Sequence, residues 1–195
     1  MSEEDFLGHL DFRLTNPDKG RLLISEPTLP DPNFSRTVVL LTEHNTEGSV
    51  GFVLNRRSDM NLNEIYDDFG TSDVPVYIGG PVGANRLFFI HTIGPELDHT
   101  IEVMDGLYWG GDLKQIEYML TNGLAKRNQV RFFVGYSGWS EGQLEMEIEQ
   151  NSWIVSKTSV QQVMSDSEHF WKKVIRGLGK RFEVLSNFPT NPNLN

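Results

Sequence analysis

The sequence contains no cysteine, and this absence excludes several classes of chemistry at once. Without thiols the chain forms no disulfide, offers no thiolate nucleophile, and binds neither zinc nor an iron–sulfur cluster through cysteine. Long apolar runs are also missing, since no stretch approaches the roughly 18 residues of a transmembrane helix. The acidic start, Met1–Asp5, is not followed by the apolar segment of a secretion signal. The sequence therefore predicts a cytoplasmic protein.

Basic residues are scarce: 17 Lys and Arg stand against 27 Asp and Glu, for a net charge of −10. Nucleic acids and anionic lipids both attract positive charge, so this balance argues against direct nucleic-acid contact and against a membrane surface. One basic cluster exists, over residues 172–181. Direct DNA binding stays open as an alternative on the basis of that cluster.

What is present is typical of one folded domain. The chain has 195 residues, of which 38% are hydrophobic. This is enough to bury a sizeable core without covalent cross-links. We expect the domain to span residues 20–185. Residues 1–19 are predicted to be a tail or docking segment, with a short docking helix over 6–14, and residues 186–195 a C-terminal tail.

The apolar patterning indicates an α+β fold. Asp105-Gly106 is the strongest turn signal, because this dipeptide suits a two-residue hairpin. Short apolar runs predict strands over 21–25, 37–43, 48–55, 76–78, 87–92, 100–104, 107–109, 130–136 and 153–156. Amphipathic segments with capping residues predict helices over 61–69, 112–122, 140–150, 158–164 and 167–178. We expect a single domain with one mixed, largely antiparallel sheet and flanking helices.

Two glycine-rich segments are similar to a nucleophile motif and to a phosphate-binding loop, but the spacing of their residues fits neither. Gly135–Trp139 approaches the nucleophile pattern G-x-S-x-G, but Trp139 stands where the last glycine should be. We interpret this segment as a tight turn from strand to helix, and not as the setting of a Ser137 nucleophile. Gly79–Gly83 lacks the spacing of a phosphate-binding loop and reads as a structural turn.

The titratable residues form no recognisable metal or cofactor motif. None of the five histidines lies four residues from another, so no helical metal pair exists, and we predict neither a metal nor a cofactor. Four glutamates crowd the predicted helix 140–150, which favours a solvated acidic face. Carboxylates that face a cleft or a partner remain the alternative. These glutamates are Glu141, Glu145, Glu147 and Glu149.

Several longer runs make the chain similar to a known family. They are GRLLISEPTLPDPNFSRTVVLLTEH, GSVGFVLNR, PVYIGGPV and GYSGWSEGQLEMEIEQNSW, in this order over about residues 20–180. The chain resembles the YqgE/AlgH family of bacterial proteins. This resemblance implies a cytosolic protein with a compact α+β fold; members are often labelled transcriptional regulators, without an established biochemical activity. The family's signature positions include Glu147 and Trp153. The chain departs from the pattern at Arg57, where proline is usual, and at Ser137, where alanine is usual.

Together, these observations favour a non-catalytic, regulatory domain that binds a small ligand or a partner protein. The candidate site is placed where two strand ends meet the segment 135–143. Asn55 and Gln143 would orient a ligand, Arg56 would pair with an anion, and aromatic rings would wall the pocket. The full candidate set is Glu43, His44, Asn55, Arg56, Tyr136, Trp139 and Gln143.

An enzyme is the main alternative to this binding role. A hydrolase would use His44 as a base together with Glu43 or a glutamate of the 141–149 helix. The sequence leaves the oligomeric state open.

Overall fold

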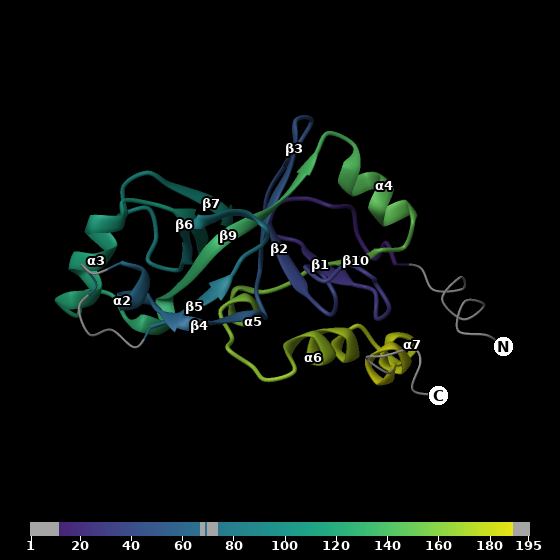
Figure 1. Cartoon of the computed structure of the whole chain (residues 1–195). Coiled ribbons are helices and arrows are strands. Elements are labelled where there is room, and N and C mark those ends of the chain that lie inside the picture. Colours follow the sequence, from purple (N-terminus) through teal and green to yellow (C-terminus); the bar gives the residue numbers. More distant parts are fainter. Residues whose placement is uncertain (1–11, 67–68, 70–73, 189–195) are drawn as a thin grey trace.

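The structure is a computed structural model that describes residues 12–66, 69 and 74–188 (Figure 1). Ten strands form a mixed sheet in the order β10-β1-β2-β3-β9-β6-β8-β7, with β5 parallel to β9 and β4 paired to β5. The predicted α+β class is confirmed. The strands are β1 (Leu22–Ser25), β2 (Val38–Asn45), β3 (Gly48–Val53), β4 (Arg57–Asn61), β5 (Pro75–Ile78), β6 (Val82–His91), β7 (Thr100–Met104), β8 (Leu107–Gly110), β9 (Val130–Ser140) and β10 (Trp153–Ser156).

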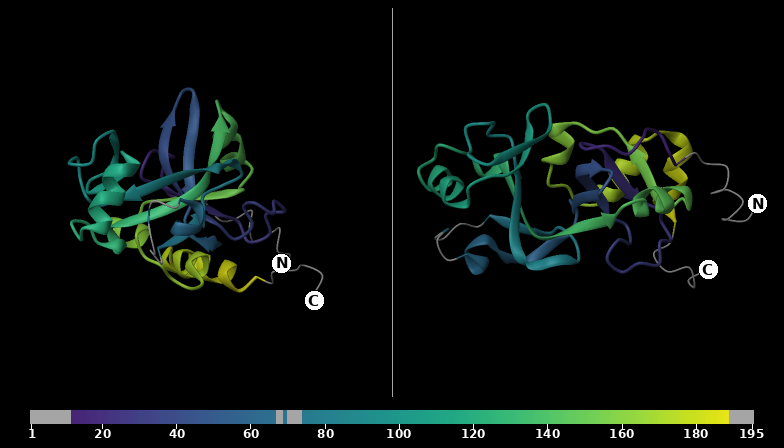
Figure 2. Two further views of the ribbon diagram at one scale, coloured as in Figure 1. Left: turned by 60° about the vertical axis from the view of Figure 1, so that its left-hand side comes forward. Right: turned by 90° about the horizontal axis from the view of Figure 1, so that it is seen from above.

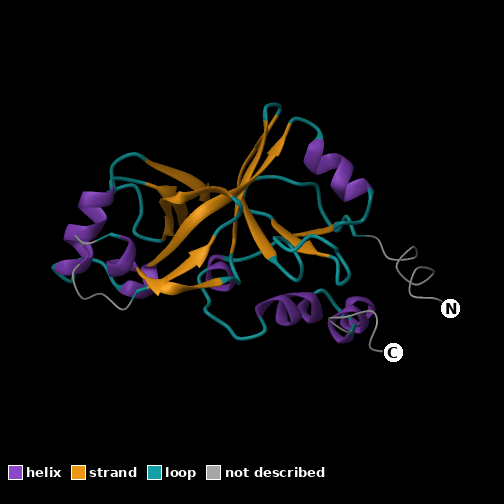
Figure 3. Ribbon diagram, viewed as in Figure 1, coloured by secondary structure: helices purple, strands orange, loops and turns teal. Residues whose placement is uncertain are grey.

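Short helices flank this sheet (Figure 3). Asp112 caps one of them as predicted, because its side chain accepts hydrogen bonds from the N–H groups of Lys114 and Gln115. The α-helices are α2 (Leu62–Ile65), α3 (Leu113–Thr121), α4 (Gln143–Glu149), α5 (Val160–Val163), α6 (Phe170–Gly177) and α7 (Lys180–Glu183), and the 3₁₀ turns are η2 (Arg127–Gln129) and η3 (Val184–Asn187).

Alternating side chains divide the core between the two faces of the sheet. Leu40 of β2 packs with Trp171 and Ile175 of α6, whereas Leu41 packs with Leu144 of α4. A third cluster lies under α2 and α3. In Figure 1, α4 accordingly lies above one end of the sheet, and α6 and α7 lie beneath it. The continuous apolar run in β2 thus reflects burial on both faces.

The hairpin of β2 and β3 and the last residues of β9 rise together away from α6 and α7 (Figure 2). Gly48 at the tip of the hairpin faces Ser140 of β9. Its φ is +135°, and a Cβ there would strike the carbonyl oxygen of Trp139, so only glycine allows this close approach.

The structure corrects several of the predicted elements. Residues 135–140 are not a turn, because β9 continues through them to Ser140. Gly135 takes φ +69° within β9, and beyond it Ser137 to Ser140 pair with β3. The polar segment of β4 was not predicted as a strand. The helix expected over 61–69 is present only at Leu62–Ile65, and part of that range lies outside the described residues.

The expected docking helix over 6–14 lies mostly outside the described residues. Phe12 is 2% exposed, and its carbonyl oxygen accepts a hydrogen bond from the N–H of Val155. At the other end of the chain, Ser186 is fully buried. In the part of the chain that the structure describes, no helix has the length and apolarity needed to cross a bilayer.

Candidate functional site

The candidate residues at the hairpin fall on two faces of the sheet. His44 is opposite Ser49 across β2 and β3, and Ser49 is opposite Trp139 across β3 and β9. Directly opposed residues of antiparallel strands point to the same side, so these three side chains share the face that α4 covers. Glu43 is opposite Val50 and therefore points to the other face.

On the face that α4 covers, one carboxylate gathers three donors. The indole N–H groups of Trp139 and Trp153 donate to Oε2 of Glu147 at 2.9 and 2.8 Å, and the amide of Gln143 donates to its Oε1 at 3.0 Å. The ring of Phe34 lies 5.9 Å from Trp139 and 5.4 Å from Trp153, between ring centroids. We call these five residues the Glu147 cluster.

A cleft of about 280 Å³ opens beside the Glu147 cluster. It lies between α4, the end of β9, the start of β10 and the loop from β1 to β2. Two of the predicted site residues, Trp139 and Gln143, meet here. The lining residues are Leu29, Asp31, Phe34, Gly138, Trp139, Gln143, Glu147, Ser152 and Trp153. We call it the smaller cleft.

His44 makes contacts of the kind that the hydrolase alternative requires. Its Nδ1 lies 2.8 Å from Oγ of Ser49, and its Nε2 lies 3.6 Å from Oε1 of Glu145 on α4. Ser49, however, is 4% exposed. Ser137 is fully buried, and its hydroxyl donates to the carbonyl oxygen of Gly79 at 3.0 Å. Neither serine lines the smaller cleft or the larger one described below.

Asn55 and Arg56 follow the opposite end of β3, beyond Val53. The side chain of Asn55 accepts a hydrogen bond from the N–H of Val38 at 2.8 Å and donates to the carbonyl oxygen of Arg36 at 2.9 Å. Arg56 donates to the carbonyl oxygen of Pro32. Both side chains thus hold the loop that leads into β2.

Tyr136 belongs to neither group. Its ring lies 5.6 Å from that of Phe88 and packs beside Gly138, on the face opposite Trp139. The seven candidate residues therefore do not line one cavity. The structure brings Trp139 and Gln143 together at the smaller cleft, places His44 beside Glu145 of α4, and places Asn55 at a second cleft.

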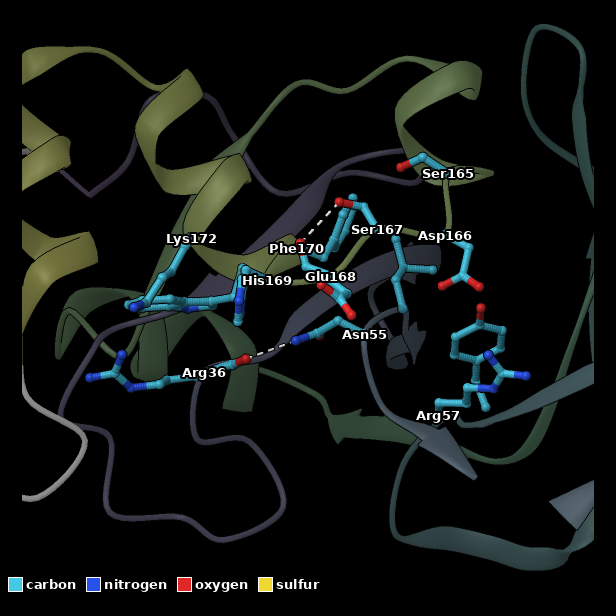
Figure 4. A pocket seen from close by; sticks show the side chains of 13 residues that line it. Arg36, Asn55, Arg57, Ser165, Asp166, Ser167, Glu168, His169, Phe170 and Lys172 are labelled. Carbon is cyan, nitrogen blue, oxygen red and sulfur yellow. Dashed lines mark hydrogen bonds between the residues drawn. The ribbon is translucent and has the colours of Figure 1, made fainter. Parts of the chain in front are cut away.

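That second, larger cleft has a volume of about 570 Å³ (Figure 4). It lies between the ends of the central strands and the segment that leads into α6. Asn55 lies in its wall beside Arg36, to which it is hydrogen-bonded. The lining residues are Arg36, Leu54, Asn55, Arg57, Tyr77, Ser165, Asp166, Ser167, Glu168, His169, Phe170, Trp171 and Lys172.

Three lysine and arginine side chains among the described residues line the larger cleft: Arg36, Arg57 and Lys172. Arg36 is held in place, since its guanidinium lies 4.9 Å from the ring centroid of Trp171 and donates to the carbonyl oxygen of Phe188 at 2.6 Å. Burial lowers the pKa of Arg36, but from so high a value that it stays charged at neutral pH. The described lining therefore has one more basic side chain of these types than it has carboxylates, which are Asp166 and Glu168.

Behind this cleft lies a buried arginine that no sequence pattern pointed to. Arg131 is 6% exposed and donates to the carbonyl oxygens of Leu54 and Val163, both at 2.6 Å. Its guanidinium lies 4.1 Å from the ring centroid of Tyr77. Burial lowers the pKa of Arg131, and its interactions with Tyr77 and Asp166 oppose that shift. Asp166 is thus an electrostatic neighbour of this buried cation.

Tyr77 links these groups to the cleft. Burial raises the pKa of its hydroxyl, the charge of Arg131 lowers it, and the hydrogen bond with Asp166 raises it again. The phenol therefore stays protonated at neutral pH. It offers the larger cleft a neutral hydroxyl and not a base.

The first turn of α6 also borders the larger cleft, through Phe170, Trp171 and Lys172. His169 precedes the helix with φ +57°, and no side chain caps its N-terminus. The first N–H groups of a helix have no partner within it and carry partial positive charge. This end of α6 adds to the positive character of the cleft.

No group of three or more His, Asp or Glu side chains within residues 12–66, 69 and 74–188 could hold a metal ion. His91 is fully buried, and burial lowers the pKa of its imidazole to about 4.

The family model described as AlgH-like matches residues 22–183, most of the chain. The chain belongs to the AlgH-like family. A UPF0301 protein of Chlorobaculum tepidum is 41% identical over 186 residues, which cover 95% of this chain and 98% of the relative. A UPF0301 protein of Parabacteroides distasonis is 41% identical over 191 residues, or 94% and 96% of the two chains.

Two solved structures share the fold of this chain. The solution structure of AlgH from Pseudomonas aeruginosa superposes with a TM-score of 0.70 at 28% identity and covers 91% of this chain and 98% of AlgH. The crystal structure of DIP2367 from Corynebacterium diphtheriae gives a TM-score of 0.74 at 24% identity, covering 89% and 94%. The family is one of uncharacterised function, so function must be argued from the two clefts.

Proposed function

We propose that this AlgH-like chain is a non-catalytic binding domain that takes a small anionic ligand in the larger cleft. The observation that carries the proposal is a cleft of about 570 Å³ lined by Arg36, Arg57 and Lys172. Its volume falls in the range of small-molecule sites. We place this binding in the cytoplasm, the compartment that the sequence predicts.

The charge balance of the larger cleft supports an anion. Among the described residues, three basic side chains line the cleft against two carboxylates, Asp166 and Glu168, and Asp166 is also an electrostatic neighbour of the buried guanidinium of Arg131. The whole chain carries a net charge of −10, so a local excess of cations is unusual on this molecule. A phosphate or carboxylate group is the chemistry that such a cleft stabilises.

Preorganisation of the cleft also favours binding. Arg36 is already fixed by Trp171 and by the carbonyl oxygen of Phe188, and Asn55 is fixed by its two backbone partners. Groups that are held before the ligand arrives lose little conformational entropy when it binds. A regulatory role, if exerted here, would consist of the ligand altering this region where α6 meets the central strands.

The test is a calorimetric titration of the protein with inorganic pyrophosphate and with citrate at low ionic strength. We expect saturable binding that Lys172→Gln weakens about threefold to tenfold, or roughly 0.7–1.4 kcal/mol, as for one partly exposed ion pair. Lys180→Gln is the matched control, because Lys180 is exposed on α7 and outside the cleft. No binding by either anion, or an equal loss in both variants, would refute the proposal.

The hydrolase alternative is favoured by one observation, the contacts of His44 with Ser49 and Glu145. A serine nucleophile must also reach its substrate, and Ser49 is 4% exposed. We therefore expect no covalent labelling of the folded protein by a fluorophosphonate probe, measured by intact mass. Labelling that is lost in Ser49→Ala and in His44→Ala would instead establish the enzyme.

A further inference from the structure

The smaller cleft differs in chemistry from the larger one. Among the residues that the structure describes, its lining contains two carboxylates, Asp31 and Glu147, and no lysine, arginine or histidine. Three aromatic side chains, Phe34, Trp139 and Trp153, complete the wall. The two clefts have no lining residue in common.

Aromatic rings and carboxylates together stabilise organic cations. The face of a tryptophan or phenylalanine ring attracts a positive charge, and the effect grows as the site is desolvated. Trp139 is 5% exposed and Trp153 is 1% exposed, so both rings are held by packing and each presents only a small part of its surface to the cleft. An ammonium group in this cleft would meet rings and a carboxylate at once.

The carboxylate of Glu147 is already oriented and can still accept hydrogen bonds. Its Oε2 accepts from two indole N–H groups, whereas its Oε1 accepts only the amide of Gln143 among the described residues. A carboxylate oxygen has two lone pairs, so Oε1 has room for another donor. Gln143 and Glu147 are four residues apart on α4, which holds both at the cleft.

Arg56 partly offsets the attraction that Asp31 exerts on a cation in the smaller cleft. The negative charge of Asp31 raises the pKa of Arg56, against a larger lowering by burial, so the two side chains are electrostatic neighbours. Asp31 also accepts a hydrogen bond from the N–H of Asn33 at 2.7 Å. We therefore assign the main attraction to Glu147 and a weaker one to Asp31.

From this geometry we infer that the smaller cleft binds a small organic cation, a primary or quaternary ammonium group. The volume of about 280 Å³ limits the ligand to a group of modest size. A free amine and the side chain of a lysine present the same chemistry here. The inference does not rest on the anion proposal, because it concerns a separate cleft.

The test is an NMR titration that follows the indole N–H signals of the four tryptophans, assigned by Trp→Phe variants. Choline and butylammonium are the probes, and 3,3-dimethylbutan-1-ol is the neutral analogue of choline. We expect the two cations to shift the signals of Trp139 and Trp153 saturably, and the neutral analogue to shift neither. Trp171 lies at the other cleft and serves as an internal control. If a lysine tripeptide binds more tightly than butylammonium, the ammonium group that the cleft binds belongs to a lysine side chain of a protein and not to a free amine.

Matched variants separate the site from the overall negative charge. Asp31→Asn keeps the shape of the side chain and an acceptor for Asn33, and we expect it to weaken choline binding about threefold. Glu149→Gln removes one charge from an exposed position of α4 outside the cleft and should leave the affinity unchanged. Absent shifts, equal shifts by the neutral alcohol, or equal losses in both variants would each overturn the inference.

Discussion

Replacing Arg131 by methionine is expected to destabilise the fold by about 3–5 kcal/mol, the cost of breaking a buried charged network by removing one partner. Methionine fills a similar volume but donates no hydrogen bond. The carbonyl oxygens of Leu54 and Val163, which Arg131 now reaches at 2.6 Å, would stay buried without these donors. Unsatisfied buried acceptors are costly because they have also lost their water.

The same substitution removes a cation that lies beside two further side chains, Tyr77 and Asp166. Tyr77 gives up the guanidinium 4.1 Å from its ring centroid, and Asp166 loses the buried positive charge that it faces. Because Arg131 joins the end of β3 to the segment after α5, it supports the back of the larger cleft. We therefore expect weaker anion binding as well as lower stability.

Urea denaturation followed by circular dichroism measures the stability effect. Arg127→Met is the control, since Arg127 is exposed on η2 and its loss should change the free energy of unfolding by less than about 0.5 kcal/mol. Arg131→Lys keeps the charge without the planar fork and should fall between the two. A loss below about 1 kcal/mol in Arg131→Met would show that the network contributes little.

The central part of the fold could be read from the sequence because its signals are local. The β-branched run at 37–43 and its return at 48–55 predicted the hairpin of β2 and β3, and Asp105-Gly106 predicted that of β7 and β8. In each case the connection between the two strands is short, and a short connection favours antiparallel pairing of the strands that it joins. The α+β class followed from these hairpins.

The full length of β9, which continues to Ser140, could not be predicted from such local signals. Residues 135–140 contain two glycines and look like a turn, yet Ser137 to Ser140 pair with Gly48 to Gly51 in β3. That pairing joins segments far apart in the chain, and it depends on Gly135 adopting a left-handed conformation within the strand. The polar strand β4 is likewise defined by its partner β5 and not by its own sequence pattern.

The candidate site was partly foreseen for a related reason. Trp139 and Gln143 do lie together at one cleft, but Asn55 lies at another. Asn55 follows the end of β3 that is opposite the end near Trp139, and the sequence does not show which end of a strand lies near which helix. Glu147 appeared to belong to a solvated acidic face. A signal was present: Glu147 lies three residues after Leu144 and next to Ile148, the buried positions of α4.

Glu147→Ala is accordingly expected to cost about 2–5 kcal/mol, because two nearly buried indole N–H groups and the Gln143 amide lose their shared acceptor. Alanine restores none of these hydrogen bonds and leaves a void between Trp139 and Trp153. Glu147→Gln should cost less, since its carbonyl oxygen can still accept from both indoles while its amide opposes that of Gln143. Both losses are measured by urea denaturation.

Exposed Glu149 on the same helix provides the control, because Glu149→Ala removes an equal charge and no hydrogen bond that involves the two indoles. In Glu147→Ala the indole N–H signals of Trp139 and Trp153 should both move in the NMR spectrum, while that of Trp171, bonded to Ser25, stays in place. If Glu149→Ala destabilises the protein as much as Glu147→Ala, the effect comes from charge or helix propensity, and the carboxylate is not what orders the two tryptophans.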